Sequence, residues 1–281
     1  MKNIFLSALL MSLALGAAAQ DNITICHVPA ADKFALFASN DSFNSQHQMP
    51  RAYVHVSQSG GKMVSFDCPD GVKANAYLIK AAKNTDQWIF VFQEWWGLND
   101  NIKKWAEDLY EEVGNVNVLA LDMYDGKMAT DRENAGKYMQ AFRQERGNAI
   151  VKGAATYAGK SAKIGTVGWC FGGGQSLQAA LTVGNQAAGC VMYYGMPEED
   201  VERLKNLNTD VLNIWATKDQ WINKSVMDKF EKNMVAAGKK LTIHSYDADH
   251  GFANPSNAIF DEKAYQDAKA KTIAYFKGRM R

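Results

Sequence analysis

Runs of apolar and β-branched residues, each the length of a β-strand, alternate with helical segments through most of this chain. Strands that are apolar throughout are typical of sheets buried on both faces, and strands that alternate with helices form parallel sheets. The sequence therefore predicts an α/β fold, a mostly parallel sheet with helices on both faces. The predicted strands are 74–80, 88–92, 116–122, 164–169, 190–194, 211–217 and 241–246, and the predicted helices are 99–113, 131–158, 173–183, 198–206, 222–237 and 261–277.

The N-terminus has the composition of a secretory signal peptide. Lys2 gives a basic start, residues 4–16 are apolar, and residues 17–19 are alanines that form an Ala-x-Ala cleavage pattern before Gln20. A membrane-spanning helix needs roughly 20 apolar residues, which neither this run nor any later stretch provides. We therefore expect an exported protein, periplasmic or secreted, with no membrane span in its mature form.

The chain divides into three segments. Residues 1–19 are the predicted signal peptide, residues 20–60 lack clear periodicity and are expected to form an ordered extension, and residues 61–281 form a single α/β domain. Lys and Arg number 31 against 30 Asp and Glu, so the chain lacks the charge excess that attracts nucleic acid or anionic lipid. We expect a small neutral or mildly charged ligand and no nucleic-acid partner.

The chain has four cysteines, Cys26, Cys68, Cys170 and Cys190. In an oxidising compartment a disulfide between Cys26 and Cys68 is expected, because both lie in the irregular N-terminal part. Cys190 lies in an apolar run and is predicted to be a buried core residue. The spacing contains no Cys-x-x-Cys pair, so neither a zinc site nor a thioredoxin-like redox site is favoured.

Cys170 lies in the frame Gly168-x-Cys170-x-Gly172, between a predicted strand and a helix that begins near Gly173. This is the frame of a nucleophile elbow with cysteine in place of serine. Such a turn holds the central residue in a strained conformation, in which side chains at the flanking positions would clash. The nucleophile then lies at a helix N-terminus, where the helix dipole lowers the pKa of a thiol and backbone N–H groups face a developing oxyanion.

The turn has two other interpretations. A dinucleotide-binding fingerprint needs a second glycine where the chain has Cys170, so this interpretation fails. Alternatively, Cys170 is a small core residue beside a glycine-rich turn, because a five-residue frame also occurs by chance. Partner residues elsewhere in the chain decide between this alternative and a nucleophile.

An α/β-hydrolase carries its nucleophile, acid and histidine in that order along the chain. Asp219 and His250 each follow a predicted strand, which puts both at the carboxyl edge of the sheet, where ligands bind in folds of this type. We predict that His250 orients or deprotonates the Cys170 thiol and that Asp219 fixes the imidazole tautomer. Asp247 and Asp249 are alternatives to Asp219, but they lie too close to His250 in sequence to hydrogen-bond the ring nitrogen that faces away from the thiol.

The remaining histidines are assigned no role in this chemistry. They are interpreted as structural or solvent-facing, since most lie in the N-terminal extension and one lies within a strand: His27, His47, His55 and His244.

With these residues in view, the chain from about residue 62 resembles the dienelactone hydrolase family, whose members have the α/β-hydrolase fold. The resemblance rests on residues 93–99, 168–174, 218–219 and 250–254. It implies a triad of Cys170, Asp219 and His250 and requires no metal and no organic cofactor.

The resemblance also implies a role for residues after the strand 88–92. Glu94 would hydrogen-bond the resting thiol and help to deprotonate it when substrate arrives, while the N–H groups of Trp95 and Phe171 would form an oxyanion hole. Glu94 at such an edge agrees with this role, although it is alternatively a charge near the N-terminus of the helix that begins near Asn99.

Substrate recognition is the part in which the chain departs from the family pattern. Arg132 fits one of the arginines that hold a substrate carboxylate, or is an exposed helix charge. Gly136 stands at the position of a tyrosine, and Asn254 stands at the position of a second arginine. A single arginine holds a carboxylate less well than a forked pair, so dienelactone itself is not the expected substrate. Trp95 and Trp96 form an aromatic substrate pocket or pack in the core.

The sequence thus predicts an exported hydrolase that cleaves a small-molecule ester or lactone through a thioester on Cys170. The alternatives are transfer of the acyl group to an amine or sugar hydroxyl at the same site, and a secreted binding module without activity. A thiol redox sensor is a further alternative, which a Cys170–Cys190 disulfide would support.

Overall fold

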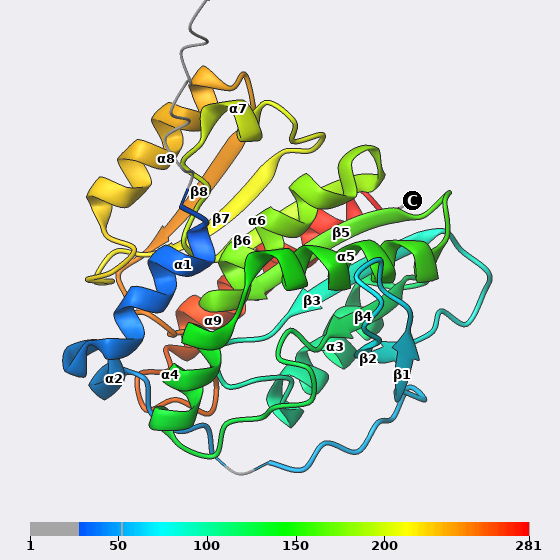
Figure 1. The fold of residues 1–281 in the computed structure, drawn as a ribbon, viewed down its shortest axis with the longest axis horizontal. Coiled ribbons are helices and arrows are strands. Elements are labelled where there is room, and N and C mark those ends of the chain that lie inside the picture. Colours follow the sequence, from blue (N-terminus) through cyan, green and yellow to red (C-terminus); the bar gives the residue numbers. More distant parts are fainter. Residues whose placement is uncertain (1–27, 52, 281) are drawn as a thin grey trace, which may run out of the picture.

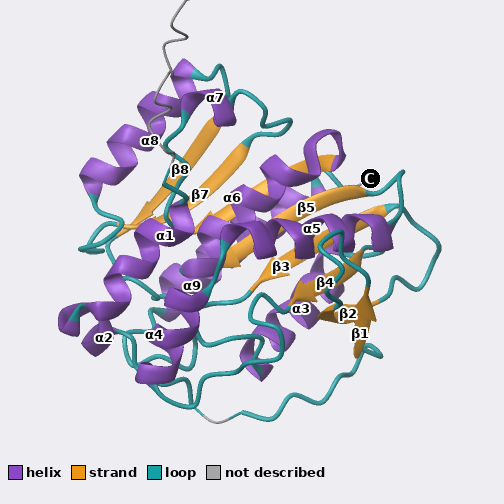
Figure 2. Cartoon of the chain, in the orientation of Figure 1, coloured by secondary structure: helices purple, strands orange, loops and turns teal. Residues whose placement is uncertain are grey.

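The computed structural model describes residues 28–51 and 53–280, and these residues form one eight-stranded sheet with helices on both of its faces (Figures 1 and 2). The strand order is β1-β2-β4-β3-β5-β6-β7-β8. The strands are β1 (Lys62–Phe66), β2 (Ala74–Ile79), β3 (Gln87–Phe92), β4 (Asn117–Leu121), β5 (Lys163–Trp169), β6 (Ala187–Tyr193), β7 (Val211–Ala216) and β8 (Leu241–Tyr246).

The sheet is mostly parallel, as predicted. Strand β1 pairs antiparallel with β2, β2 pairs antiparallel with β4, and all later pairs are parallel. All of β3 and β4 is buried, which explains their unbroken apolar sequences. Strand β1 was not predicted, because it is an exposed edge strand whose only buried residue is Phe66.

Helices cover the sheet in two layers. Helices α5 (Gln144–Ala158) and α6 (Phe171–Val183) pack together on one face, and α3 (Asp100–Val113) and α9 (Glu262–Lys277) pack together on the other (Figure 1). The remaining helices of the domain are α4 (Arg132–Ala141), α7 (Val201–Leu204) and α8 (Lys224–Ala236), and a 3₁₀ turn spans Gly184–Gln186. Because the strands from β3 onward run parallel, their carboxyl ends meet at one edge, where Cys170, Asp219 and His250 lie.

The predicted helix 131–158 is two helices in the structure. Phe142 and Arg143 both have extended backbone between α4 and α5. The break lets the Phe142 ring pack edge-on against Phe171, with ring centroids 4.9 Å apart. The contact stabilises the start of α6, and periodicity alone gave no sign of it.

The described part of the N-terminal extension also contains helices, α1 (Ala30–Ala35), a 3₁₀ turn (Leu36–Ser39) and α2 (Asp41–Gln46). Helix α1 packs on α4 and α6, and the 3₁₀ turn packs on α4 (Figure 1). Residues 28–51 therefore lie across α4 and across α6, the helix that begins directly after Cys170.

Some expectations fall on residues outside the described part of the chain. The signal peptide at 1–19, which stays a prediction, and Cys26 both lie there. The thiol of Cys68 is buried and free, so the structure does not support the expected disulfide between Cys26 and Cys68. Cys190 is fully buried, as predicted. Within residues 28–51 and 53–280, no helix has the length and apolar character to cross a membrane.

Candidate active site

Cys170 occupies a strained turn between β5 and α6. Its φ of 59° and ψ of −120° lie in a region that residues with a side chain rarely adopt. A Cβ at Gly168 would lie 2.1 Å from the carbonyl oxygen of Gly172, and a Cβ at Gly172 would lie 2.4 Å from the carbonyl oxygens of Phe92 and Gln93. The turn therefore requires glycine at both flanking positions, as the frame predicted, and it puts Cys170 at the N-cap of α6.

Asp219 and His250 meet at the same edge of the sheet. Nδ1 of His250 lies 2.5 Å from Oδ2 of Asp219, and both side chains are buried. Oδ1 of Asp219 accepts hydrogen bonds from the backbone N–H groups of Trp221 and Ile222, which fixes the carboxylate. Asp219 thus holds the proton on Nδ1 and leaves Nε2 of His250 as the ring atom that faces the site.

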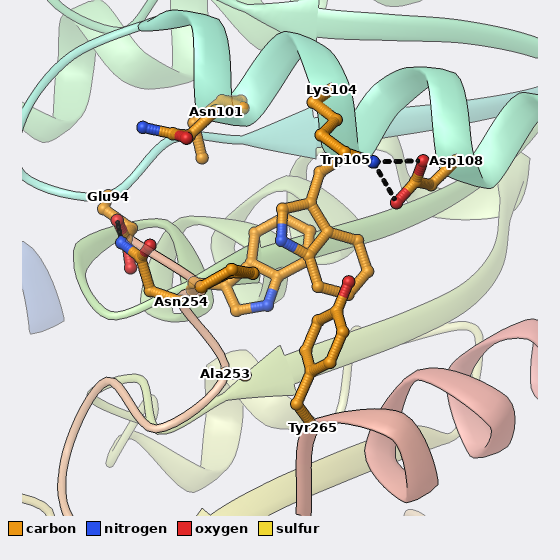
Figure 3. A pocket seen from close by; sticks show the side chains of 11 residues that line it. Glu94, Asn101, Lys104, Trp105, Asp108, Ala253, Asn254 and Tyr265 are labelled. Carbon is orange, nitrogen blue, oxygen red and sulfur yellow. Dashed lines mark hydrogen bonds and ion pairs between the residues drawn. The ribbon is translucent and has the colours of Figure 1, made fainter. Parts of the chain in front are cut away.

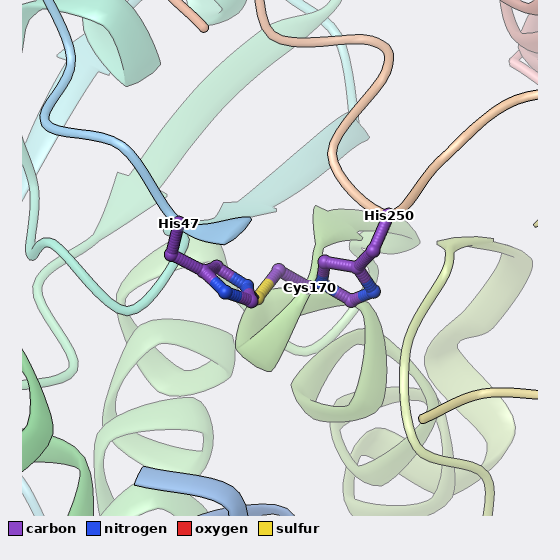
Figure 4. A group of neighbouring side chains, drawn as sticks. All are labelled: His47, Cys170 and His250. Atoms are coloured by element: carbon purple, nitrogen blue, oxygen red, sulfur yellow. Dashed lines mark hydrogen bonds between the residues drawn. The ribbon is translucent and has the colours of Figure 1, made fainter. Parts of the chain in front are cut away.

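The structure brings Cys170 next to this pair. Sγ of Cys170 and one ring nitrogen from each of two histidines, His47 and His250, all lie within 4.8 Å of one another (Figure 4). Nε2 of His250 is buried and has no hydrogen-bond partner within the described residues. The group that it faces is the Cys170 thiol. Cys170, Asp219 and His250 therefore lie together at one edge of the sheet, with His250 between the carboxylate of Asp219 and the thiol.

His47 was predicted to be structural or solvent-facing; it is not solvent-facing, and it lies beside Cys170. The His47 side chain is buried, and its Nε2 lies 3.8 Å from Sγ of Cys170. Nδ1 of His47 donates to the backbone oxygen of Phe43 at 2.7 Å, because a carbonyl oxygen only accepts. This bond fixes the tautomer and turns the lone pair of Nε2 toward the thiol.

The available sequence signal for this segment was the helical spacing of Ala30, Phe34 and Ala38, which are all buried. That spacing predicts an apolar helix face that packs against another part of the protein, but it does not predict which part. By contrast, His55 does have a structural role, since its ring contacts Tyr77 and Glu107 away from Cys170.

Residues 28–51 close the site with a cluster of aromatic side chains. The ring of Phe43 lies 5.4 Å from Trp95 and 5.5 Å from Trp221, and the ring of Phe34 lies 6.3 Å from His250. The cavity that remains beside Cys170 has a volume of about 10 Å³, roughly the space of one water molecule. In this conformation the thiol is sealed from solvent.

Glu94 lines the same small cavity at the end of β3. Its Oε2 accepts a hydrogen bond of 2.7 Å from Nδ2 of Asn254, so Asn254 holds the carboxyl group in place. The expected hydrogen bond between Glu94 and the thiol stays a prediction. Asn254 in turn is fixed by Ser256, whose N–H and hydroxyl both donate to Oδ1 of Asn254.

A larger cavity of about 80 Å³ lies on the other side of Glu94 and Asn254. Trp105 and Tyr265 form the wall opposite these two residues (Figure 3). Cys170, Asp219 and His250 do not line this cavity. The Glu94–Asn254 pair thus separates an apolar space from the thiol.

Burial and charge set the protonation states of the site. Burial raises the pKa of the Cys170 thiol, although His250 opposes this shift. Burial disfavours the charged form of His250, but Asp219 outweighs this effect and raises the pKa of the imidazole. Burial and the neighbouring His250 lower the pKa of His47 to about 3, so His47 is neutral at physiological pH. Burial thus favours the neutral form of the Cys170 thiol, and Asp219 makes His250 the more basic of the two imidazoles beside it.

Glu94 gives a pH dependence that can be measured. Burial raises its pKa from 4.5 to about 7, against the opposing effects of His250 and the Asn254 hydrogen bond. Between these values the folded protein binds the proton more tightly than the unfolded chain, so the free energy of unfolding falls as pH rises through this range. As the pH is raised from 4 to 8, we expect the wild type to lose on the order of 3 kcal/mol in free energy of unfolding relative to Glu94→Gln.

Chemical denaturation of both proteins at the two pH values measures this difference, because the contributions of all other titrating groups cancel. The glutamine keeps an oxygen that can accept from Asn254, so the hydrogen bond is retained. A stability difference between the two proteins that does not change with pH would contradict the buried, neutral state of Glu94.

The other predicted site residues lie at different distances from the thiol. Trp95 and Trp96 are buried, line the cavity beside Cys170, and have ring centroids 4.9 Å apart. Phe171 directly follows Cys170, and its backbone N–H is directed to the sulfur. Arg132 is exposed, and its Nε donates to the backbone oxygen of His47, so in this structure it fastens residues 28–51 to α4.

Comparisons with known proteins agree with this architecture. The model of the dienelactone hydrolase family matches residues 74–280. "Protein usf" of Aquifex pyrophilus is 28% identical over 233 residues, which are 77% of this chain and 98% of that protein. A carboxymethylenebutenolidase of Pseudomonas sp. (strain P51) is 26% identical over 230 residues, 76% of this chain and 94% of that enzyme.

Among solved structures, a putative dienelactone hydrolase from Klebsiella pneumoniae superposes with a TM-score of 0.64 at 21% identity, over 77% of this chain and 98% of that one. A dienelactone hydrolase-like promiscuous phosphotriesterase from metagenomic libraries gives a TM-score of 0.68 at 19% identity, over 79% and 99% of the two chains. At these identities the superpositions show the α/β-hydrolase fold. Since the family model spans most of the sheet and every strand that leads to the site, the chain belongs to the dienelactone hydrolase family and is an ester or lactone hydrolase.

Proposed function

We propose that this hydrolase cleaves a small ester or lactone in two steps, through a thioester on Cys170. The observation that carries the proposal is the Cys170 thiol on a strained turn, beside an imidazole that Asp219 holds with Nε2 free. A core cysteine would need neither the strained backbone nor a buried acid–imidazole pair, each of which costs stability.

The first step forms the acyl-enzyme. Nε2 of His250 takes the proton of the Cys170 thiol, and the sulfur attacks the carbonyl carbon of the substrate. The electron pair of the carbonyl bond moves to its oxygen, which the N–H groups of Trp95 and Phe171 stabilise. The intermediate then collapses, the bond to the leaving alkoxide breaks, and His250 returns the proton to that oxygen.

The second step releases the acid. Water attacks the thioester carbonyl while Nε2 of His250 takes a proton from it, and the bond between carbon and sulfur breaks. The sulfur recovers the proton from His250. For Glu94 we propose that its buried carboxyl group keeps the resting thiol protonated, and that a substrate ends this state by displacing the carboxyl group from the thiol.

Substrate entry requires a change in conformation. A cavity of about 10 Å³ admits a water molecule but not an ester, so residues that line it, among them His47 and Gln48 of the N-terminal segment, move before the first step. The exposed Arg132 is tied to this segment through the His47 carbonyl oxygen. Because the resemblance expects carboxylate-binding residues where the chain has Gly136 and Asn254, we propose a substrate without an obligatory carboxylate.

The same acyl-enzyme can transfer its acyl group to an amine or a sugar hydroxyl instead of water. Incubation with a short p-nitrophenyl ester and a small lactone, with and without added acceptors, separates the two reactions by their products. Free acid as the main product in the presence of acceptor supports hydrolysis, while an acylated acceptor supports transfer. Absence of turnover with every ester and lactone would instead favour a binding module.

We further propose that the enzyme is exported, because of the basic, apolar and Ala-x-Ala sequence of residues 1–19. Expressed with its full sequence in a bacterium, the protein is expected in the periplasmic fraction with an N-terminus at or near Gln20. Intact mass spectrometry measures the N-terminus, and a full-length protein confined to the cytosol would contradict export.

A further inference from the structure

The Cys170 thiol lies between two imidazoles that come from distant parts of the chain (Figure 4). His47 belongs to the N-terminal segment, and His250 belongs to the loop after β8. The acyl-transfer route uses one of these histidines, since a thiol needs one base. The second imidazole, with its lone pair directed at the same sulfur, has no part in that chemistry.

Each imidazole is held by a partner on the nitrogen that faces away from the sulfur. Asp219 binds Nδ1 of His250 at 2.5 Å, and the backbone oxygen of Phe43 binds Nδ1 of His47 at 2.7 Å. A carboxylate or carbonyl on the remote nitrogen is the outer-shell arrangement found around histidines that bind metal ions. It leaves the lone pairs of both Nε2 atoms directed toward Cys170, and Nε2 of His250 is buried without a hydrogen-bond partner.

We propose that Cys170, His47 and His250 bind one Zn²⁺ ion. Zinc takes thiolate and imidazole ligands at about 2.3 Å and 2.0–2.1 Å, which separates ligand atoms of a tetrahedral site by roughly 3.3–3.6 Å. The sulfur and Nε2 of His47 are 3.8 Å apart, and all three ligand atoms lie within 4.8 Å of one another. Small rotations of the two rings therefore complete the protein side of a tetrahedral site.

The fourth position faces the small cavity, which has room for one water molecule. Binding converts the Cys170 thiol to a thiolate and releases one proton to the solvent, with no change in oxidation state. The sulfur electron pair is then shared with zinc. Bound zinc therefore prevents the sulfur from attacking an ester, a consequence that rests on the proposed function.

Cobalt substitution tests the site directly. The reduced, chelator-treated protein is titrated with Co²⁺, and a tetrahedral site with a thiolate ligand gives a sulfur-to-cobalt charge-transfer band in the near ultraviolet. We expect this band at one equivalent of Co²⁺, its displacement by Zn²⁺, and its loss in Cys170→Ala. Absence of the band in the wild type would overturn the proposal.

The histidine ligand is tested by Zn²⁺ affinity in competition with a chromophoric chelator. His47→Ala should weaken binding by more than the roughly 10- to 100-fold that loss of an outer-shell partner costs. His244→Ala is the matched control, because His244 is half-buried in β8 and lies outside the site. Equal Zn²⁺ affinity in His47→Ala and the wild type would overturn the assignment of His47.

Protection of the thiol provides a measurement that needs no variant. One equivalent of Zn²⁺ should slow alkylation of Cys170 by iodoacetamide, read by peptide mass spectrometry, and a chelator should restore the rate. An unchanged rate would contradict a zinc–sulfur bond. These readouts need no turnover, so a charge-transfer band in a protein without esterase activity would support the zinc site while refuting the proposed hydrolysis.

Discussion

Cys170→Ala is expected to lower kcat/KM for a p-nitrophenyl ester by roughly 10⁴-fold or more, because the acyl-enzyme cannot form without the sulfur. The change removes one buried atom at the N-cap of α6 and leaves the glycines of the turn in place. Steady-state hydrolysis by the purified variant and the wild type measures the effect. The residual activity then reports what the oxyanion hole and substrate binding contribute alone.

The matched control is Cys190→Ala. Cys190 is also a fully buried cysteine, but it lies within β6 and its sulfur contacts the Ser176 hydroxyl at 3.6 Å, not the site. This variant is expected to lose some stability to the small cavity that it creates and to keep its activity within about twofold. Equal activity of Cys170→Ala and Cys190→Ala would refute Cys170 as the nucleophile.

Asp219→Asn is expected to lower kcat by about 10³- to 10⁴-fold with little change in fold. The asparagine oxygen still accepts from the N–H groups of Trp221 and Ile222, as Oδ1 of Asp219 does. Its amide then donates to Nδ1 of His250, which forces the ring proton onto Nε2. In that tautomer His250 has no lone pair to accept the proton of the Cys170 thiol.

Asp247→Asn and Asp249→Asn serve as controls, since both carboxyl groups are exposed and close to His250 in sequence. Each is expected to keep kcat within about twofold. Steady-state rates and thermal unfolding of all three variants separate a tautomer effect from misfolding. If Asp249→Asn lowered kcat as much as Asp219→Asn does, the assignment of Asp219 as the acid that orients His250 would be wrong.

The parts of the structure that the sequence predicted depend on local patterns. The unbroken apolar sequences of β3 and β4 follow from burial on both faces, and the glycines around Cys170 follow from steric clash at the turn. Asp219 and His250 were also predicted, because each follows a strand whose carboxyl end meets the same edge of the sheet. Order along the chain and edge position were enough to bring them together.

The parts that were missed depend on contacts between distant segments. His47 reaches the thiol because residues 28–51 lie across α4 and α6, and no spacing within that segment encodes this placement. The break between α4 and α5 accompanies the contact of Phe142 with Phe171, which lies in a distant part of the chain and leaves no trace in the helical periodicity. Arg132 was expected from the resemblance to hold a substrate carboxylate, yet its Nε is bound to a carbonyl oxygen of the N-terminal segment.

The most direct test of the central claim is to trap the acyl-enzyme. The protein is mixed with an ester whose thioester hydrolyses slowly, quenched in acid, and examined by intact mass spectrometry and peptide mapping. One added acyl group per chain is expected, carried by Cys170 and absent in Cys170→Ala. An acyl group on another residue, or turnover of the same ester by Cys170→Ala at the wild-type rate, would contradict it.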